Sequence, residues 1–174
     1  MINVAEKVNQ GVSLITFFGH SSTQVTDIEI GKVTDVTLGY NNGGRYPMIL
    51  VNGCNAGNIF FTSVGFGEDW ILAPGKGAIG YLAHTDAGFA SNLKRYSDIF
   101  YDLAYGDSVF INKPIGDILQ EVGQRYLSGV SLDEIQIAQV QQEVFQGDPA
   151  FSFFPVTKPD YETNDDQVFF CLLY

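Results

Sequence analysis

The sequence has few basic residues, few cysteines and no long apolar run, and each shortage excludes a class of protein. Nine Lys and Arg against 20 Asp and Glu leave a net charge of −11, which disfavours nucleic acid or an anionic membrane as a partner. Two cysteines, Cys54 and Cys171, do not make a disulfide framework, and no Cys/His spacing resembles a zinc site. No apolar run approaches the roughly 20 residues that span a bilayer, and the N-terminus lacks the regions of a signal peptide.

The apolar pattern predicts a single α/β domain with a mostly parallel sheet, since 174 residues at 45% hydrophobic content suffice for one sizeable core. A polar stretch over residues 23–44 predicts a loop with a short crossover helix. Strands are predicted from runs of apolar, β-branched and aromatic residues at 12–18, 48–51, 78–83 and 150–155. Helices are predicted from apolar spacing and capping residues at 3–9, 68–72, 89–105, 114–127 and 131–144, the last with a capping box of Ser131 and Glu134.

Polar residues follow three of the predicted strands: His20, then Cys54, then His84 with Asp86. Right-handed crossovers bring the ends of such strands to one edge of a parallel sheet. A thiol and an imidazole at one edge are the parts of a cysteine nucleophile and its proton carrier. A cysteine behind a strand is more often a small packing residue, so the pattern alone leaves both interpretations open. A nucleotide-binding domain is disfavoured because no predicted strand is followed by a GxGxxG or GKT phosphate loop.

The order of motifs resembles that of the gingipain family of caspase-like cysteine peptidases. VNQGVSLITFFGHSS matches the family's strand that ends in a glycine and the catalytic histidine, and YPMILVNGCNAGNIF matches the strand that runs into the catalytic cysteine. GKGAIGYLAHTDAGFAS and SNLKRYSDIFYDLAYGD match the next strand and a long helix, and PIGDILQEV and GDPAFSF match late motifs. The resemblance covers roughly residues 5–155.

The resemblance implies a caspase-like three-layer sandwich. The family's fold begins with one or two further strand and helix units before the histidine strand, so the chain is expected to be the larger, C-terminal part of the catalytic domain without the first strand or strands. Residues 1–158 are assigned to this domain. Residues 159–174 are interpreted as an acidic linker and the beginning of a following strand.

Carried over position by position, the resemblance makes His20 the catalytic histidine and Cys54 the nucleophile. The backbone N–H groups of Ser21 and Cys54 would form the oxyanion hole. Family members usually have glycine after the histidine, so Ser21 is a departure, and its side chain is expected to narrow the cleft.

The loop after the third strand would form one wall of the pocket for the residue before the scissile bond. His84, Asp86 and Phe89 are the expected wall residues, with Phe89 as an aromatic surface and Asp86 as a polar group. His84 as the partner of Cys54 is the less favoured alternative.

The implied function is cysteine endopeptidase activity on a polypeptide substrate, without a cofactor. A transpeptidase of the same fold is an alternative, as is a non-catalytic binding or scaffold module, which the missing strands, Ser21 and the polar late helix motivate.

The acidic residues near the C-terminus are of the type that binds calcium but lack the spacing of a known calcium loop, so a solvated linker is favoured; they are Asp160, Glu162, Asp165 and Asp166. The resemblance also implies an extracellular or bacterial cell-surface location and further domains in a longer parent chain.

Overall fold

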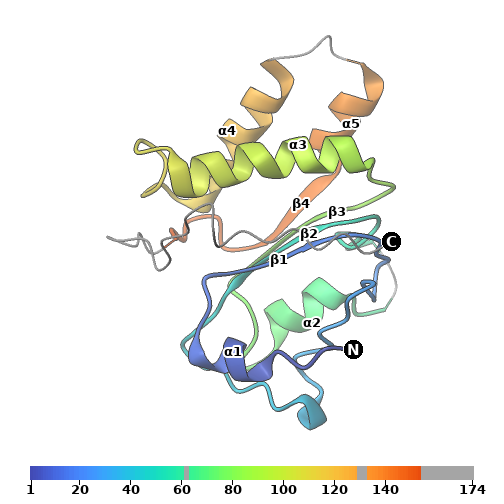
Figure 1. Cartoon of the computed structure of the whole chain (residues 1–174), viewed down its shortest axis with the longest axis vertical. Coiled ribbons are helices and arrows are strands. Elements are labelled where there is room, and N and C mark those ends of the chain that lie inside the picture. Colours follow the sequence, from blue (N-terminus) through green and yellow to red (C-terminus); the bar gives the residue numbers. More distant parts are fainter. Residues whose placement is uncertain (61–62, 129–132, 154–174) are drawn as a thin grey trace, which may run out of the picture.

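A four-stranded sheet forms the centre of the computed structural model, which describes residues 1–60, 63–128 and 133–153. The strands lie in the order β1 (Leu14–Phe18), β2 (Met48–Asn52), β3 (Gly80–His84) and β4 (Glu143–Gly147). The first three are parallel, and β4 is antiparallel to β3. Helices cover both faces of the sheet (Figure 1), so the mostly parallel three-layer α/β sandwich is confirmed.

The two helical layers differ in size. α1 (Ala5–Gln10) and α2 (Phe66–Leu72) lie on one face of the sheet, and α3 (Ala90–Tyr101), α4 (Ile115–Ser128) and α5 (Glu134–Gln142) lie on the other (Figure 1). A π-helical turn, η2 (Asp102–Gly106), continues α3, and a single 3₁₀ turn, η1 (Val36–Leu38), lies in the first crossover. In the part of the chain that the structure describes, none of the helices has the length and apolarity needed to cross a membrane.

Alternation along the strands divides the core in two. Ile49 and Val51 of β2 pack in the layer of α1 and α2, around the fully buried Trp70. Met48 and Leu50 pack in the other layer, against α3 and α4. Because every residue of β2 is buried, this strand reads as a continuous apolar run, as expected of a central parallel strand.

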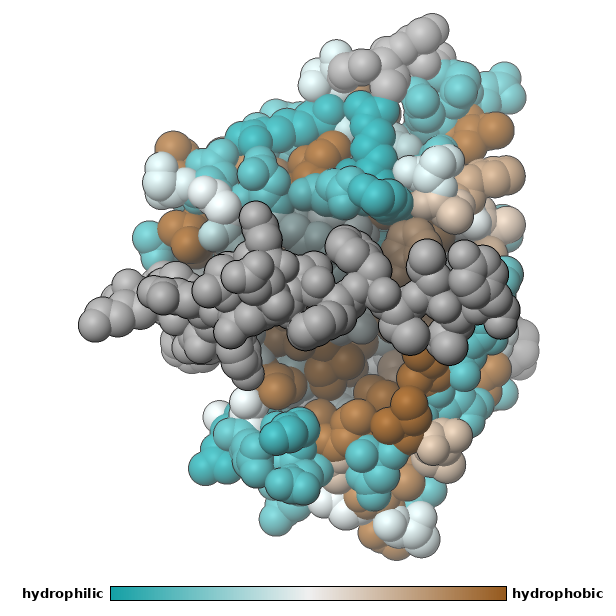
Figure 2. Space-filling view, in the orientation of Figure 1, coloured by the Kyte–Doolittle hydropathy of each residue, from teal (hydrophilic) through white to brown (hydrophobic). Residues whose placement is uncertain are grey.

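The helix α3 is amphipathic, as its sequence pattern predicts. Leu93, Tyr96 and Phe100 are buried, and Tyr96 and Phe100 belong to the core cluster between α3 and the sheet. The opposite side carries the exposed ion pair of Lys94 and Asp98, and the outer surface of α3 is mostly hydrophilic (Figure 2). Periodicity alone was sufficient to place this helix, because its burial follows the helical repeat.

The prediction of a last strand over residues 150–155 was wrong for its described part, 150–153, and its last two residues lie outside the described residues. The fourth strand is Glu143–Gly147, inside and just beyond the segment predicted as the end of a helix, while Ser152 makes only an isolated bridge to Pro114. The helix α5 ends at Gln142, and Val144 and Phe145 then pair in extended conformation with Ala83 and Leu82. These β-branched and aromatic residues favour a strand, and the Gln-rich α5 offers little apolar periodicity to extend the helix.

Two smaller predictions also need correction. The crossover over residues 23–44 contains only the η1 turn, because Gly31, Gly39 and Gly44 take positive φ angles that interrupt a helix. The helix α5 is capped by Asp133, whose carboxylate accepts a hydrogen bond from the N–H of Gln136. The predicted cap, Ser131, lies outside the described residues, as do the predicted linker and strand over 159–174.

Candidate functional site

His20 and Cys54 lie on neighbouring loops at the carboxyl edge of the sheet. The register of β1 and β2 pairs Phe18 with Asn52, so each of the two residues follows its strand by the same two positions. The hydroxyl of Ser21 donates a hydrogen bond of 2.8 Å to the carbonyl of Cys54. The serine side chain, expected to narrow the cleft, therefore joins the two loops.

Gly53 allows this close approach. A Cβ atom at this position would lie 2.8 Å from the carbonyl oxygen of Gly19 and 2.9 Å from Cβ of Ser21. Any side chain at position 53 would therefore push the histidine loop away from the cysteine loop.

Cys54 is partly exposed, and its thiol is free. The N–H of Gly88 points at its Sγ atom over 3.4 Å. The thiol in turn lies 3.7 Å from the carbonyl oxygen of Gly88, to which it can donate a hydrogen bond. Within the described residues, no hydrogen bond joins the His20 imidazole to this thiol.

The backbone N–H groups expected to form the oxyanion hole have no protein acceptor in the described part of the chain. Ser21 faces Thr26 in an isolated antiparallel bridge. The flanking bonds, Ser22 N–H to Val25 and Asp27 N–H to His20, make this a non-hydrogen-bonded pair, in which both N–H groups point away from the partner. The N–H of Ser21 is therefore available to another acceptor.

His84 ends β3 and is only 1% exposed. Its Nδ1 atom lies 2.9 Å from the carbonyl oxygen of Asp86, and because a carbonyl only accepts, Nδ1 must carry the hydrogen. Burial lowers the pKa of His84, so the ring is neutral at pH 7. Its other nitrogen, Nε2, is buried and has no partner among the described residues.

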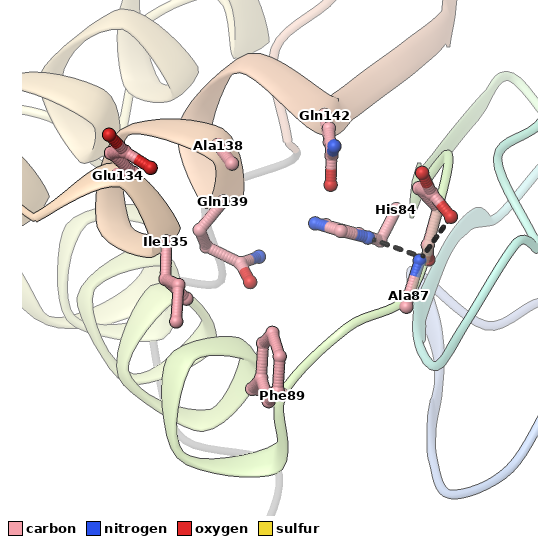
Figure 3. Close-up of a pocket in the computed structure, with 9 residues that line it drawn as sticks. His84, Ala87, Phe89, Glu134, Ile135, Ala138, Gln139 and Gln142 are labelled. Carbon is pink, nitrogen blue, oxygen red and sulfur yellow. Dashed lines mark hydrogen bonds between the residues drawn. The ribbon is translucent and has the colours of Figure 1, made fainter.

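A cavity of about 280 Å³ lies between α5 and the loop after β3. His84, Asp86 and Phe89 all line it, together with residues of α5 that include Glu134 and Gln139. Figure 3 shows the imidazole of His84 and the amide of Gln139 facing this shared space. The structure thus brings together the three residues predicted to contact substrate.

The catalytic candidates lie elsewhere. His20 and Ser21 line a separate cavity of about 460 Å³, which Asp27 and Glu29 also line. Cys54 lines neither of the two cavities. The residues predicted to contact substrate therefore share one cavity. The catalytic pair, His20 and Cys54, and the oxyanion-hole pair, Ser21 and Cys54, do not.

Sequence reasoning missed Glu143, which lies opposite His84 across β3 and β4. The bond from Thr85 N–H to the carbonyl of Gln142 makes this a non-hydrogen-bonded pair, the arrangement in which cross-strand side chains lie closest. Burial raises the pKa of Glu143 to about 8, and Gln139 donates a hydrogen bond of 2.7 Å to its carboxyl group. The unusual polarity of α5 was the only sequence signal of this partly buried polar cluster.

We expect Glu143→Gln to stabilise the fold at alkaline pH. The folded-state pKa of about 8 lies above the ordinary value of 4.5, so the folded protein retains a proton that the unfolded chain releases. Stability therefore falls as pH rises from about 4.5 to 8 and then levels off. Glutamine needs no proton and still accepts the bond from Gln139, so the free energy of unfolding should rise by about 1–3 kcal/mol at pH 8.5 and change little at pH 4.5.

Urea denaturation of both proteins at the two pH values measures this difference. The exposed Glu134, changed to glutamine, serves as the control and should shift stability equally at both pH values. Parallel stability curves for the wild type and Glu143→Gln would contradict a Glu143 that keeps its proton in the folded protein.

Metal binding finds no support in the described part of the chain, where no group of three or more His, Cys, Asp or Glu residues is placed to hold an ion. The calcium candidates lie outside the described residues; they are Asp160, Glu162, Asp165 and Asp166.

Solved structures of similar fold include the Arg-specific cysteine proteinase gingipain R (RgpB), with a TM-score of 0.71 at 20% identity over 87% of this chain and 35% of that one. The complex of the pro- and mature domains of RgpB from Porphyromonas gingivalis gives a TM-score of 0.68 at 18% identity, covering 86% and 36%. A structure described only as a protease gives 0.69 at 14% identity, covering 86% and 37%. At these identities the likeness shows the fold, which confirms the caspase-like sandwich.

The chain spans about a third of the length of these structures. No curated protein matches it significantly. The sequence model of Peptidase family C25 matches residues 2–154, which includes every described strand and helix. The chain therefore belongs to peptidase family C25.

Proposed function

We propose that this chain carries the nucleophile and the histidine of a cysteine endopeptidase, with Cys54 and His20 in these roles. The observation that carries the proposal is the hydrogen bond from the Ser21 hydroxyl to the Cys54 carbonyl, which holds the two loops together at one edge of the sheet. Membership of family C25 and the fold of known cysteine proteinases support it.

In the proposed reaction, the Cys54 thiolate attacks the carbonyl carbon of the peptide bond and forms a C–S bond. The N–H groups of Ser21 and Cys54 donate to the oxygen that becomes negative. As the C–N bond breaks, His20 gives a proton to the leaving amine. Water, deprotonated by His20, then hydrolyses the thioester and restores the thiol. These steps need neither a metal ion nor an organic cofactor.

The cavity beside His84 is proposed to receive the substrate side chain before the scissile bond. Asp86 and Glu134 line it, and among the described residues no Lys or Arg does. Carboxylates without a cationic neighbour attract a positive side chain, so a basic residue is the proposed preference. The solved structure described as an Arg-specific proteinase is consistent with this.

Two further parts of the proposal concern the setting of the reaction. The substrate is a polypeptide, and an amine that replaced water in the second step would make the enzyme a transpeptidase. We place the reaction outside the cell or on the cell surface, in a longer parent chain. The solved complex of pro- and mature domains supports the presence of partner domains.

The reactivity of Cys54 tests this function. An assembled site should let Cys54 react with iodoacetamide well below the ordinary thiol pKa of about 8.5, and His20→Ala should slow this reaction by about 10-fold or more at pH 7. Peptide mass spectrometry follows the labelling of Cys54 against pH, with Cys171 as the comparison in the same sample. Ordinary reactivity of Cys54, unchanged without His20, would favour the non-catalytic binding module.

A further inference from the structure

We propose that His84 is a positioning residue for Cys54: its Nδ1–H fixes the carbonyl of Asp86, and this carbonyl holds the residue that follows the nucleophile. The inference rests on the proposed role of Cys54. It gives His84 a function on the side of the ring that faces away from the substrate cavity.

The carbonyl oxygen of Asp86 joins the two loops. It accepts a hydrogen bond from Nδ1–H of His84 over 2.9 Å and a second one, also of 2.9 Å, from the N–H of Asn55. An imidazole that fixes this carbonyl therefore also fixes the peptide group directly after Cys54.

Asn55 has an uncommon backbone conformation that this hydrogen bond supports. Its φ angle of 58° places it in the left-handed region, and it is the only non-glycine residue with positive φ in the described part of the chain. This conformation is unfavourable for most L-residues and better tolerated by asparagine, and it persists where neighbouring groups hold the backbone. The hydrogen bond to Asp86 is the contact that holds the N–H of Asn55.

Two further bonds flank this one. The N–H of Gly57 donates to the carbonyl of His84 over 2.9 Å, and the N–H of Gly88 donates to Sγ of Cys54 over 3.4 Å. The loop after β3 therefore contacts the nucleophile turn at His84, Asp86 and Gly88. The His84 side chain holds the middle of these contacts, so its loss should also loosen the contact between Gly88 and the sulfur.

The contact with the Asp86 carbonyl requires a hydrogen on Nδ1 of His84. The imidazole is 1% exposed, and its Nε2 faces the cavity without a partner among the described residues. The charged and polar groups on this side come from three elements: Glu143 on β4, Glu134, Gln139 and Gln142 on α5, and Asp86 on the loop itself. Among the described residues, none of them accepts a hydrogen bond from Nδ1–H in place of the Asp86 carbonyl.

Asparagine and glutamine at position 84 provide a matched test. The amide nitrogen of asparagine occupies nearly the position of Nδ1, so His84→Asn retains a donor to the Asp86 carbonyl. The amide nitrogen of glutamine lies one bond further out, near the position of Nε2, so His84→Gln does not. His84→Leu removes both. Circular dichroism and thermal unfolding establish that each variant is folded.

The readout is the rate of Cys54 alkylation against pH, followed by peptide mass spectrometry. We expect His84→Asn to remain within about 2-fold of the wild type. His84→Gln and His84→Leu should slow alkylation of Cys54 at pH 7 by about 10-fold, because the peptide group after the nucleophile is no longer held. A profile of His84→Gln equal to that of the wild type would overturn the positioning role, and so would an equal loss in His84→Asn and His84→Gln.

The wild-type protein provides a second test that needs no substitution. Nitrogen-15 spectra of the imidazole distinguish the two neutral tautomers, and the proposal requires hydrogen on Nδ1; hydrogen on Nε2 would overturn it even if the variants do not fold. The two proposals also fail separately. An ordinary thiol profile in the wild type contradicts the nucleophile, whereas a fast wild-type thiol that is insensitive to His84→Gln contradicts only the positioning role.

Discussion

Replacing Cys54 with alanine is expected to reduce kcat/KM for peptide hydrolysis by about 10⁴-fold or more, as removal of the nucleophile does in enzymes that form an acyl intermediate. The N–H groups of Ser21 and residue 54 would remain in this variant, but no atom would be left to form the thioester. Cleavage is measured on an unfolded protein substrate, by mass spectrometry of newly formed peptide ends, so that no preference has to be assumed.

The matched control is Cys171→Ala, which removes the other cysteine of the chain and should leave cleavage unchanged. Both the hydrolytic and the transpeptidase form of the proposal require Cys54. Activity retained in Cys54→Ala would therefore contradict both, whatever the second substrate is.

The parallel part of the fold could be predicted from the sequence because its signals are local. Residues 48–51 form an apolar run that is buried on both faces, and glycines or polar residues mark where the strands end. The antiparallel strand Glu143–Gly147 could not be predicted in this way, because its pairing with β3 is a long-range contact. Its residues follow α5 without a glycine or proline to mark the boundary, so the helical pattern was extended over them.

The side chains of the candidate site could also be predicted from the sequence, whereas its backbone contacts could not. His20 and Cys54 were identified from side-chain chemistry and from a family resemblance, since histidine and cysteine at strand ends are visible in a sequence. The contact from Gly88 N–H to Cys54 Sγ was not identified. Every residue except proline has a backbone N–H, so the residue type does not show which N–H makes such a contact. The same holds for the carbonyl of Asp86, whose side chain was noted for its charge while its backbone oxygen holds Asn55.

Backbone contacts also explain why the nucleophile turn is rich in glycine. Gly53 makes room for the histidine loop, and Gly57 allows the turn to lie against the end of β3. At neither position does the structure record a positive φ, so the requirement is for space and not for an unusual backbone angle. Substitution at these positions therefore tests packing directly.

Gly57→Ala is expected to give the largest loss of stability of the substitutions considered. A methyl group at this position would lie 2.7 Å from the carbonyl carbon of Ala83 and 3.2 Å from that of His84. Both atoms belong to β3, which is buried along its whole length and paired on both sides, so they cannot move aside. The turn must move instead, and the hydrogen bond from Gly57 to the His84 carbonyl is lost with it.

We therefore expect the free energy of unfolding to fall by about 2–4 kcal/mol in Gly57→Ala, as for overpacking of a well-ordered interior combined with a lost backbone bond. Urea denaturation at pH 7 measures this.

The matched control is Gly106→Ala, where the nearest atom to the new methyl group is the side-chain oxygen of Asp102 at 3.3 Å, which can rotate away. The free energy of unfolding of Gly106→Ala should differ from that of the wild type by less than about 0.5 kcal/mol. Because the displaced turn carries Cys54, alkylation of the thiol should slow in Gly57→Ala and not in Gly106→Ala. Equal stability of the two variants would mean that the cysteine turn does not rest on β3 as described.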